Sequence, residues 1–397
     1  MAISLVLLEP TRLPRFARND KTFRSTLTAR PLRTASASYP SSFFRSSMSP
    51  SVKKGLLAGL ALVALVGAFG AWYVFGSITP DYGTDKKRGV KIPPGAAFSQ
   101  IVDSLDASGI VKSRSRFERI AQWTGWARQL DAGYYEVKEG TSAYDLLGKL
   151  RRGEQSYVKV TVPPGVTLDR LAAISGRNLY AGPDGMKRAL TSDSLARALG
   201  TEQKNLLGFM LPDTYFFFWL DSPNKVVKTI KGKFDDLVRE NGPQPDGLTN
   251  AQVATMASIV EWETAKADER PRVAEVYLNR YRIGMPLQAD PTVQYAILER
   301  EGAKRRLLFV DYRIQHPYNT YLFKGLPPGP VTNPGASAVK AVLKPEDHDY
   351  LYFVAKGDGG HVFSRTLAEH ARAAEAFYAT MRERRAAQRA AEGDSAR

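Results

Sequence analysis

The feature that most constrains this chain is an apolar run from Gly55 to Gly76 that contains no charged residue. An α-helix rises about 1.5 Å per residue, so a helix of this length crosses the ~30 Å hydrocarbon layer of a bilayer. Trp72 and Tyr73 lie near its end, where aromatic side chains gather at membrane interfaces. A cleaved signal peptide has a shorter apolar core, and core helices of soluble domains are rarely so uniformly apolar. We therefore expect a permanent single-pass transmembrane helix over residues 55–76.

The segment before this run is basic and rich in serine. Residues 1–54 contain too few apolar side chains to offset the entropy of ordering the chain, so we expect them to be disordered. The sequence that begins at Met48 is typical of a natural protein start placed directly before an apolar run, which predicts that residues 1–47 are an over-long gene model. Basic residues flank both ends of the run, so charge alone leaves the orientation of the helix undecided.

Composition limits the chemistry that the rest of the chain can perform. With 397 residues and 43% hydrophobic content, the chain can form more than one folded domain. It contains no cysteine and four histidines, which excludes disulfides and thiolate chemistry and gives little support to a metal site. The net charge of +16 suits an anionic surface or an acidic polymer such as a cell-wall glycan. No nucleic-acid-binding motif accompanies the charge, so we expect no nucleic acid partner, no metal and no cofactor.

Three short units of similar pattern follow a Pro/Gly/Asp-containing linker at residues 77–89. They begin with Val90-Lys-Ile-Pro-Pro-Gly, Tyr135-Glu-Val-Lys-Glu-Gly and Val160-Thr-Val-Pro-Pro-Gly. Each predicts a strand, a glycine-bearing turn and an amphipathic helix with a Ser, Thr or Asp cap. Small strand and helix units of this kind resemble LysM glycan-binding modules, and a structural repeat without a ligand would give the same pattern.

The segment from Met256 to Thr264 places a carboxyl group among apolar side chains. At helical spacing Met256, Ile259, Val260 and Glu263 share one face, while Glu261 points away from it. Burial raises the pKa of a carboxyl group because it penalises the charged form, so Glu263 is a candidate general acid. The alternative is an ion pair with a nearby arginine.

Residues 205–370 resemble the endolytic murein transglycosylases, the YceG-like family. The resemblance rests on Gly208-Phe-Met-Leu-Pro-Asp-Thr-Tyr215, Met256 to Thr264, Val276-Tyr-Leu-Asn-Arg280, Ile283 to Tyr295, Tyr318-Asn-Thr-Tyr321, Gly325-Leu-Pro-Pro-Gly-Pro330, Asn333-Pro-Gly335, Tyr350 to Ala355 and Gly360-His-Val-Phe363. It implies an α+β fold with a transmembrane helix, a small LysM-like α/β subdomain and a mixed α+β catalytic domain on the cell-wall side of the cytoplasmic membrane. We expect a basic segment at 1–54, the helix at 55–76, a linker at 77–89, the subdomain at 90–157, the catalytic domain at 158–381 and a basic tail at 382–397.

The resemblance places the catalytic carboxyl group on Glu263, with Glu261 as the second choice. The chain departs from the family at Leu207, where glutamate is frequent. A lytic transglycosylase needs one acid, because the muramyl 6-hydroxyl attacks its own anomeric carbon and leaves a 1,6-anhydro end. Asp290 could complete the carboxyl pair of a hydrolase, but its position before a helix favours a loop acid that accepts hydrogen bonds from backbone amides.

Further polar residues in these blocks are candidates for binding the sugar. Gln288, Tyr318, Asn319 and Thr320 offer amide, ring and hydroxyl groups for acetamido groups and sugar faces, together with Glu261 and Asp290. Asn319 could equally close a turn. His361 and His370 are expected to be hydrogen-bonded structural residues rather than zinc ligands.

Three functions are compatible with these observations. The first is a membrane-anchored enzyme that cuts nascent peptidoglycan strands internally and so ends their elongation, beside the penicillin-binding synthases. The second is a non-catalytic scaffold that binds peptidoglycan in the envelope. The third, a cytosolic lyase, is disfavoured by the apolar helix.

Overall fold

The structure is a computed structural model that describes residues 49–394, with side chains through residue 384. Its first helix, α1 (Pro50–Phe75), is long and apolar enough to cross a membrane, and none of its residues is buried against the rest of the protein. A helix in the core of a soluble domain would be covered instead. The helix begins at Pro50, so residues 50–54, which we expected to be disordered, are helical. The predicted start at Met48 and the segment before it lie outside the described residues.

A small α+β domain follows α1. Its elements are β1 (Lys87–Ile92), α2 (Phe98–Ala107), α3 (Arg114–Thr124), the 3₁₀ helix η1 (Trp126–Arg128), β2 (Gly133–Lys138) and α4 (Ala143–Arg151). The two strands pair antiparallel, from Lys87 opposite Lys138 to Ile92 opposite Gly133. One hydrophobic core runs from Ile78 to Leu150.

The predicted linker at residues 77–89 is instead part of this domain. Ile78, Thr79 and Tyr82 are buried, and β1 already begins at Lys87. The Pro and Gly residues that indicated a flexible linker therefore shape a packed segment, because Ile78 supplies apolar area to the core.

The remaining elements form a larger mixed α+β domain with its own core, from Val158 to Leu343. They are β3 (Tyr157–Val162), α5 (Leu168–Gly176), α6 (Gly182–Leu190), α7 (Asp193–Ala198), η2 (Gln203–Phe209), β4 (Asp213–Phe218), α8 (Pro223–Glu240), η3 (Pro245–Gly247), α9 (Asn250–Glu263), α10 (Arg270–Arg282), α11 (Asp290–Glu301), η4 (Asp311–Arg313), α12 (Ala336–Leu343), β5 (Tyr352–Ala355), β6 (His361–Ser364) and α13 (Leu367–Asp394). Antiparallel pairs join β3 to β4 and β5 to β6. The mixed α+β class is as expected, and residues 382–394 of the predicted tail form the end of α13.

The three predicted repeat units do not form one sheet. The first two contribute β1 and β2 to the small domain, whereas the third contributes β3, which pairs with β4. Their turns follow the predicted chemistry: Gly95 and Gly165 adopt positive φ angles after each Pro-Pro pair, which glycine tolerates without strain.

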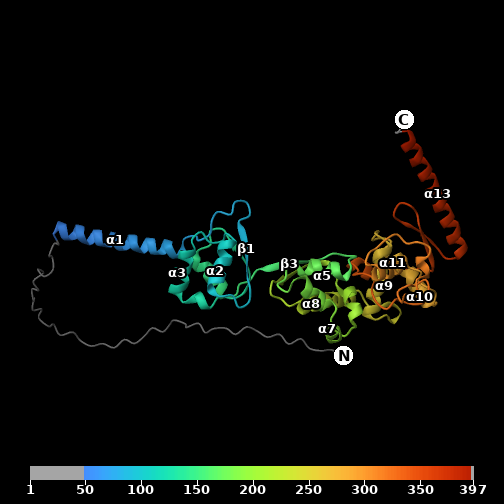
Figure 1. The fold of residues 1–397 in the computed structure, drawn as a ribbon, viewed down its shortest axis with the longest axis horizontal. Coiled ribbons are helices and arrows are strands. Elements are labelled where there is room, and N and C mark those ends of the chain that lie inside the picture. The colour runs from blue at the N-terminus through green and yellow to red at the C-terminus, as the bar shows by residue number, and fades with distance from the viewer. Residues whose placement is uncertain (1–48, 395–397) are drawn as a thin grey trace, which may run out of the picture. The chain divides into compact units, whose positions relative to one another are not determined.

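Helix α9 packs against η2, α10, α11 and α12, and Figure 1 shows it beside α10 and α11. It starts with a capping box, in which Thr249 and Gln252 each accept a backbone hydrogen bond from the other. All residues from Val253 to Val260 are buried. The apolar stripe that the sequence predicted is therefore a helix buried all round, since neighbouring helices cover every side.

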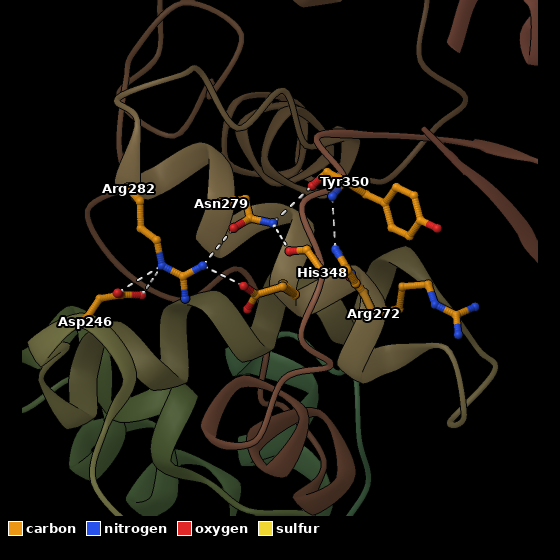
Figure 2. A network of polar contacts seen from close by, with 7 residues as sticks. Asp246, Arg272, Asn279, Arg282, His348 and Tyr350 are labelled. Atoms are coloured by element: carbon orange, nitrogen blue, oxygen red, sulfur yellow. Dashed lines mark hydrogen bonds and ion pairs between the residues drawn. The ribbon is translucent and has the colours of Figure 1, made fainter. Parts of the chain in front are cut away.

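A network of polar contacts fixes the outer face of α10 (Figure 2). The Arg282 guanidinium donates to both carboxylate oxygens of Asp246 at 2.9 Å and to the Asn279 side-chain oxygen at 2.8 Å. Asn279 in turn donates to the carbonyl oxygens of His348, at 2.8 Å, and Tyr350, at 3.3 Å. These contacts hold the segment before β5 against α10, whose other face carries Tyr277.

Candidate functional site

A pocket of about 360 Å³ opens where α9, α10, α11, β5 and α13 meet. Glu263, the last residue of α9, lies in its wall. The helix ends there because Thr264 turns to an extended conformation. The lining residues are Glu263, Tyr277, Arg280, Gln288, Asp290, Tyr321, Tyr352, Phe353, Leu367 and His370. The pocket thus combines one carboxyl group on a buried helix with aromatic rings, a guanidinium and an amide.

The Glu263 carboxyl group is held in a state suited to proton transfer. The pKa of the Glu263 carboxyl group is raised to about 7, chiefly by burial and also by the negative charge of Asp290, while the Tyr277 hydroxyl and Arg280 act in the opposite direction. The Tyr277 hydroxyl donates to Glu263 Oε2 at 3.0 Å. Tyr277 is itself almost completely buried and packs edge-to-face on Phe353. A carboxyl group with a pKa near neutrality can both give and take a proton.

Glu261 lies in a different environment, outside the pocket. Its Oε1 atom accepts from Arg270 at 3.0 Å, and its Oε2 atom accepts from the backbone amide of Gly335 at 2.9 Å. Both charged side chains are only about a tenth exposed. The ion pair that was the alternative interpretation for Glu263 is thus made by Glu261, which fastens the segment before α12 to α9.

Asp290 reaches the pocket from the first turn of α11. Its two carboxylate oxygens accept hydrogen bonds from the hydroxyl groups of Tyr321, at 2.7 Å, and Tyr312, at 3.4 Å. We expected backbone amides as donors, and this was wrong within the described residues: Ala289 precedes the helix as its cap, so Asp290 is already helical and its side chain turns towards the two rings.

Gln288 lies beside Asp290 in an uncommon backbone conformation. Its φ angle is +50°, a region that residues other than glycine rarely adopt. The backbone amide of Gln288 donates to the Thr320 carbonyl oxygen at 3.1 Å, which holds this conformation in place, and its side chain is exposed to the pocket. Strained residues of this kind gather at binding sites.

Tyr318, Asn319 and Thr320 are buried, and none of them is among the described residues that line the pocket. Asn319 is fully buried and donates to the carbonyl oxygens of Tyr312 and Ile314, so it closes a turn. The Thr320 hydroxyl accepts from the Ala289 amide at 3.0 Å. Tyr318 stacks on Tyr295. Together they support the loop that carries the pocket residues.

Several lining residues were not singled out by the sequence. Arg280 is buried and donates to the carbonyl oxygens of Leu351 and Leu287, each at 2.6 Å, and burial lowers the pKa of its guanidinium. Its spacing of three residues from Tyr277 on one helix was the available signal.

His370 stacks on Tyr352, and its Nδ1 atom is buried without a hydrogen-bond partner among the described residues, so it is not the hydrogen-bonded group we expected.

Two other residues that the sequence singled out lie away from the pocket. His361 pairs through Nδ1 with Glu269 at 2.8 Å, as a structural residue would. Leu207 lies in the hydrophobic core on η2. Across the described part of the chain, no three His, Asp or Glu side chains converge as metal ligands would.

Comparison with known proteins identifies a family and several proteins to which this chain is similar. A model of the YceG-like family matches residues 90–376. A Bacillus subtilis protein named endolytic murein transglycosylase is 32% identical over 74% of this chain and 86% of its own length. A protein of the same name from Streptococcus pneumoniae is 29% identical over 79% of this chain, which spans 64% of that relative. A solved YceG-like protein of Listeria monocytogenes covers 73% of this chain at 28% identity, with a TM-score of 0.45.

Proposed function

This chain belongs to the YceG-like family, and from that premise we propose that it is a membrane-anchored endolytic lytic transglycosylase. Its substrate is the β-1,4 bond between N-acetylmuramic acid and N-acetylglucosamine within a peptidoglycan strand. The observation that carries the proposal is the Glu263 carboxyl group, with a pKa near 7, in the wall of a polar pocket.

In the first step, protonated Glu263 gives its proton to the glycosidic oxygen as the bond to the anomeric carbon breaks. The leaving N-acetylglucosamine departs with a new hydroxyl group. In the second step the Glu263 carboxylate takes the proton from the muramyl 6-hydroxyl while that oxygen bonds to the anomeric carbon. The product is a 1,6-anhydro end, no water is consumed, and Glu263 returns to its protonated state.

The other lining residues have roles that follow from their chemistry. Positive charge develops at the anomeric carbon as the bond breaks, and we assign its stabilisation to the Asp290 carboxylate, which accepts hydrogen bonds from two tyrosine hydroxyls. The exposed Gln288 amide can bond an acetamido group.

The presence of Asp290 in the same pocket favours hydrolysis as the competing reaction. Two carboxyl groups that flank a glycosidic bond can act as acid and as nucleophile or base, and the product then has an ordinary reducing end. The two reactions are therefore separated by the chemistry of the new chain end.

We further propose that α1 anchors the chain in the cytoplasmic membrane with both folded domains on the cell-wall side, because peptidoglycan strands lie there. The small domain would act as a LysM-like glycan-binding unit. Its antiparallel strand pair supports this role. A cavity of about 310 Å³ beside the pair is lined by Lys87, Lys138 and Lys149 together with Glu136, which pairs with Lys87. Lysines suit the carboxylates of peptidoglycan, and Lys138 is the lysine there without this partner among the described residues. Cooperation with penicillin-binding synthases remains a prediction from the family resemblance.

The test uses the full chain in detergent with uncrosslinked glycan strands, followed by mass spectrometry of the released ends. We expect anhydromuramyl ends from the wild type and from Glu375→Gln, a control at an exposed position of α13. The Glu263→Gln variant should keep its circular dichroism spectrum and release none. Reducing ends would show a hydrolase, and no cleavage by the wild type would favour a non-catalytic scaffold.

A further inference from the structure

The membrane helix passes into the small domain without a flexible joint. Three residues after the end of α1, Ile78 is completely buried in the core of the small domain. The backbone amide of Ile78 donates to Thr141 O at 2.9 Å, and its carbonyl oxygen accepts from the Lys112 amide at 2.8 Å. The orientation of the last turns of α1 is therefore coupled to the domain by main-chain contacts.

Arg116 on α3 strengthens this coupling at the C-terminal end of α1. Its guanidinium donates to the carbonyl oxygens of Trp72, Tyr73, Gly76 and Ser77, at distances from 2.6 to 3.2 Å. The last carbonyl groups of a helix have no partner within the helix and carry the negative end of its dipole, so a guanidinium stabilises them. The guanidinium also lies over the Trp72 ring, at 5.2 Å from its centroid.

The surface around this junction is rich in aromatic side chains, which range from half-buried to well exposed. Trp123, the penultimate residue of α3, is 69% exposed and packs on Tyr73 at a ring distance of 5.8 Å. Tyr144 on α4 packs on Phe75 at 5.4 Å, and Trp126 packs on Tyr144 at 5.0 Å. The aromatic surface of α1 thus continues without a break onto α3, η1 and α4.

We propose that this surface, made of Trp123, Trp126 and Tyr144, is a membrane-docking face that lies in the headgroup region of the bilayer that α1 crosses. The inference rests on the anchoring part of the proposed function. If α1 spans the bilayer, its terminal aromatic residues lie at the interface, and the rings packed on them lie at the same depth. Tryptophan and tyrosine favour this region because their rings are apolar and their polar atoms remain hydrated.

The charges beside the face fit phospholipid headgroups. Arg151 lies over the Trp126 ring at 5.1 Å, and Arg119 lies over the Tyr73 ring at 5.9 Å. Arg128, at the end of η1, is exposed. Guanidinium groups bind phosphate by paired hydrogen bonds, so a rim of arginines around apolar rings suits a lipid surface. Docking would fix the tilt of the small domain on the membrane.

The chain has no cysteine, so single-cysteine variants of the full chain can be labelled at one position. We would attach an environment-sensitive fluorophore at Trp123→Cys, at Phe69→Cys within α1, and at Lys91→Cys on β1, which lies on the side of the domain away from α3 (Figure 1). The labelled proteins are reconstituted into phosphatidylcholine and phosphatidylglycerol vesicles that contain nitroxide lipids at shallow or deep positions. Tyr144→Cys repeats the measurement from a second element if Trp123→Cys does not fold.

We expect the probe at position 123 to lose emission chiefly to shallow nitroxides, the probe at 69 chiefly to deep ones, and the probe at 91 to neither. A probe at 123 that behaves like the one at 91, while position 69 is quenched, would overturn docking and leave anchoring intact, and would favour a protein partner for this face. Loss of quenching at 69 as well would overturn both. The readout does not depend on glycan cleavage, so it is separate from the test of the enzymatic reaction.

Discussion

Replacing Tyr277 by phenylalanine tests whether the carboxyl group that titrates in catalysis is Glu263. The substitution removes the hydroxyl group that donates to Glu263 Oε2 at 3.0 Å and keeps the buried ring that packs on Phe353. This hydrogen bond lowers the pKa of Glu263, so its loss raises the pKa above the value of about 7.

The size of the shift follows from the strength of a hydrogen bond to a carboxylate. Such a bond contributes about 1.5 kcal/mol at the lower end of its usual range, which corresponds to about one pKa unit. At pH 8 the protonated fraction of Glu263 would then rise about fivefold in Tyr277→Phe. Because Glu263 acts first as an acid, the alkaline limb of the rate profile moves to higher pH.

Asp290→Asn is the matched variant with the opposite sign. The charge of Asp290 raises the pKa of Glu263, so its removal lowers that pKa and moves the alkaline limb to lower pH. The assay follows anhydromuramyl ends released from uncrosslinked strands between pH 5 and 9 under single-turnover conditions, where chemistry limits the rate. If both variants are folded and move the limb in the same direction, or leave it in place, Glu263 is not the group that titrates.

Three further predictions address stability and the membrane junction. Glu263→Gln should flatten the pH dependence of the unfolding free energy, which urea unfolding measures. Because the pKa of Glu263 is raised from 4.5 to about 7 on folding, the protonated group contributes stability that is fully present below pH 4.5 and lost as pH rises through 7. This contribution is at most about 3 kcal/mol. Glu261→Gln should destabilise the fold by about 3 kcal/mol, since it leaves Arg270 unpaired. It should leave the alkaline limb of the rate profile in place. A shifted limb would reverse the roles of the two glutamates. Arg116→Ala should speed hydrogen exchange of the amides at 76–78, because it removes the guanidinium that binds the last carbonyl oxygens of α1. Arg119→Ala should not, since the Arg119 guanidinium donates to the Ser115 carbonyl oxygen. Equal exchange in both variants would show that the Arg116 cap contributes nothing.

Local features of the structure were largely readable from the sequence. The absence of charge over 55–76 fixes an apolar helix, because that property needs no partner elsewhere in the chain. The positive φ angles in the turns at Gly95 and Gly165 follow from the sequence, because glycine adopts them without strain. At 77–89 proline and glycine indicated a linker, but Ile78 fills the core of the small domain, and no local pattern reports that burial.

The sequence by itself determined that two closely spaced glutamates lie on an apolar helix and that Glu263 shares its apolar face. It could not show which of the two carboxyl groups forms an ion pair, because helical spacing does not reveal the partners that other segments bring to α9. Tertiary structure decided this by bringing Arg270 to Glu261, and Tyr277 and Asp290 to Glu263. A pKa depends on burial and on neighbouring charges, and these come from segments that are distant in the chain.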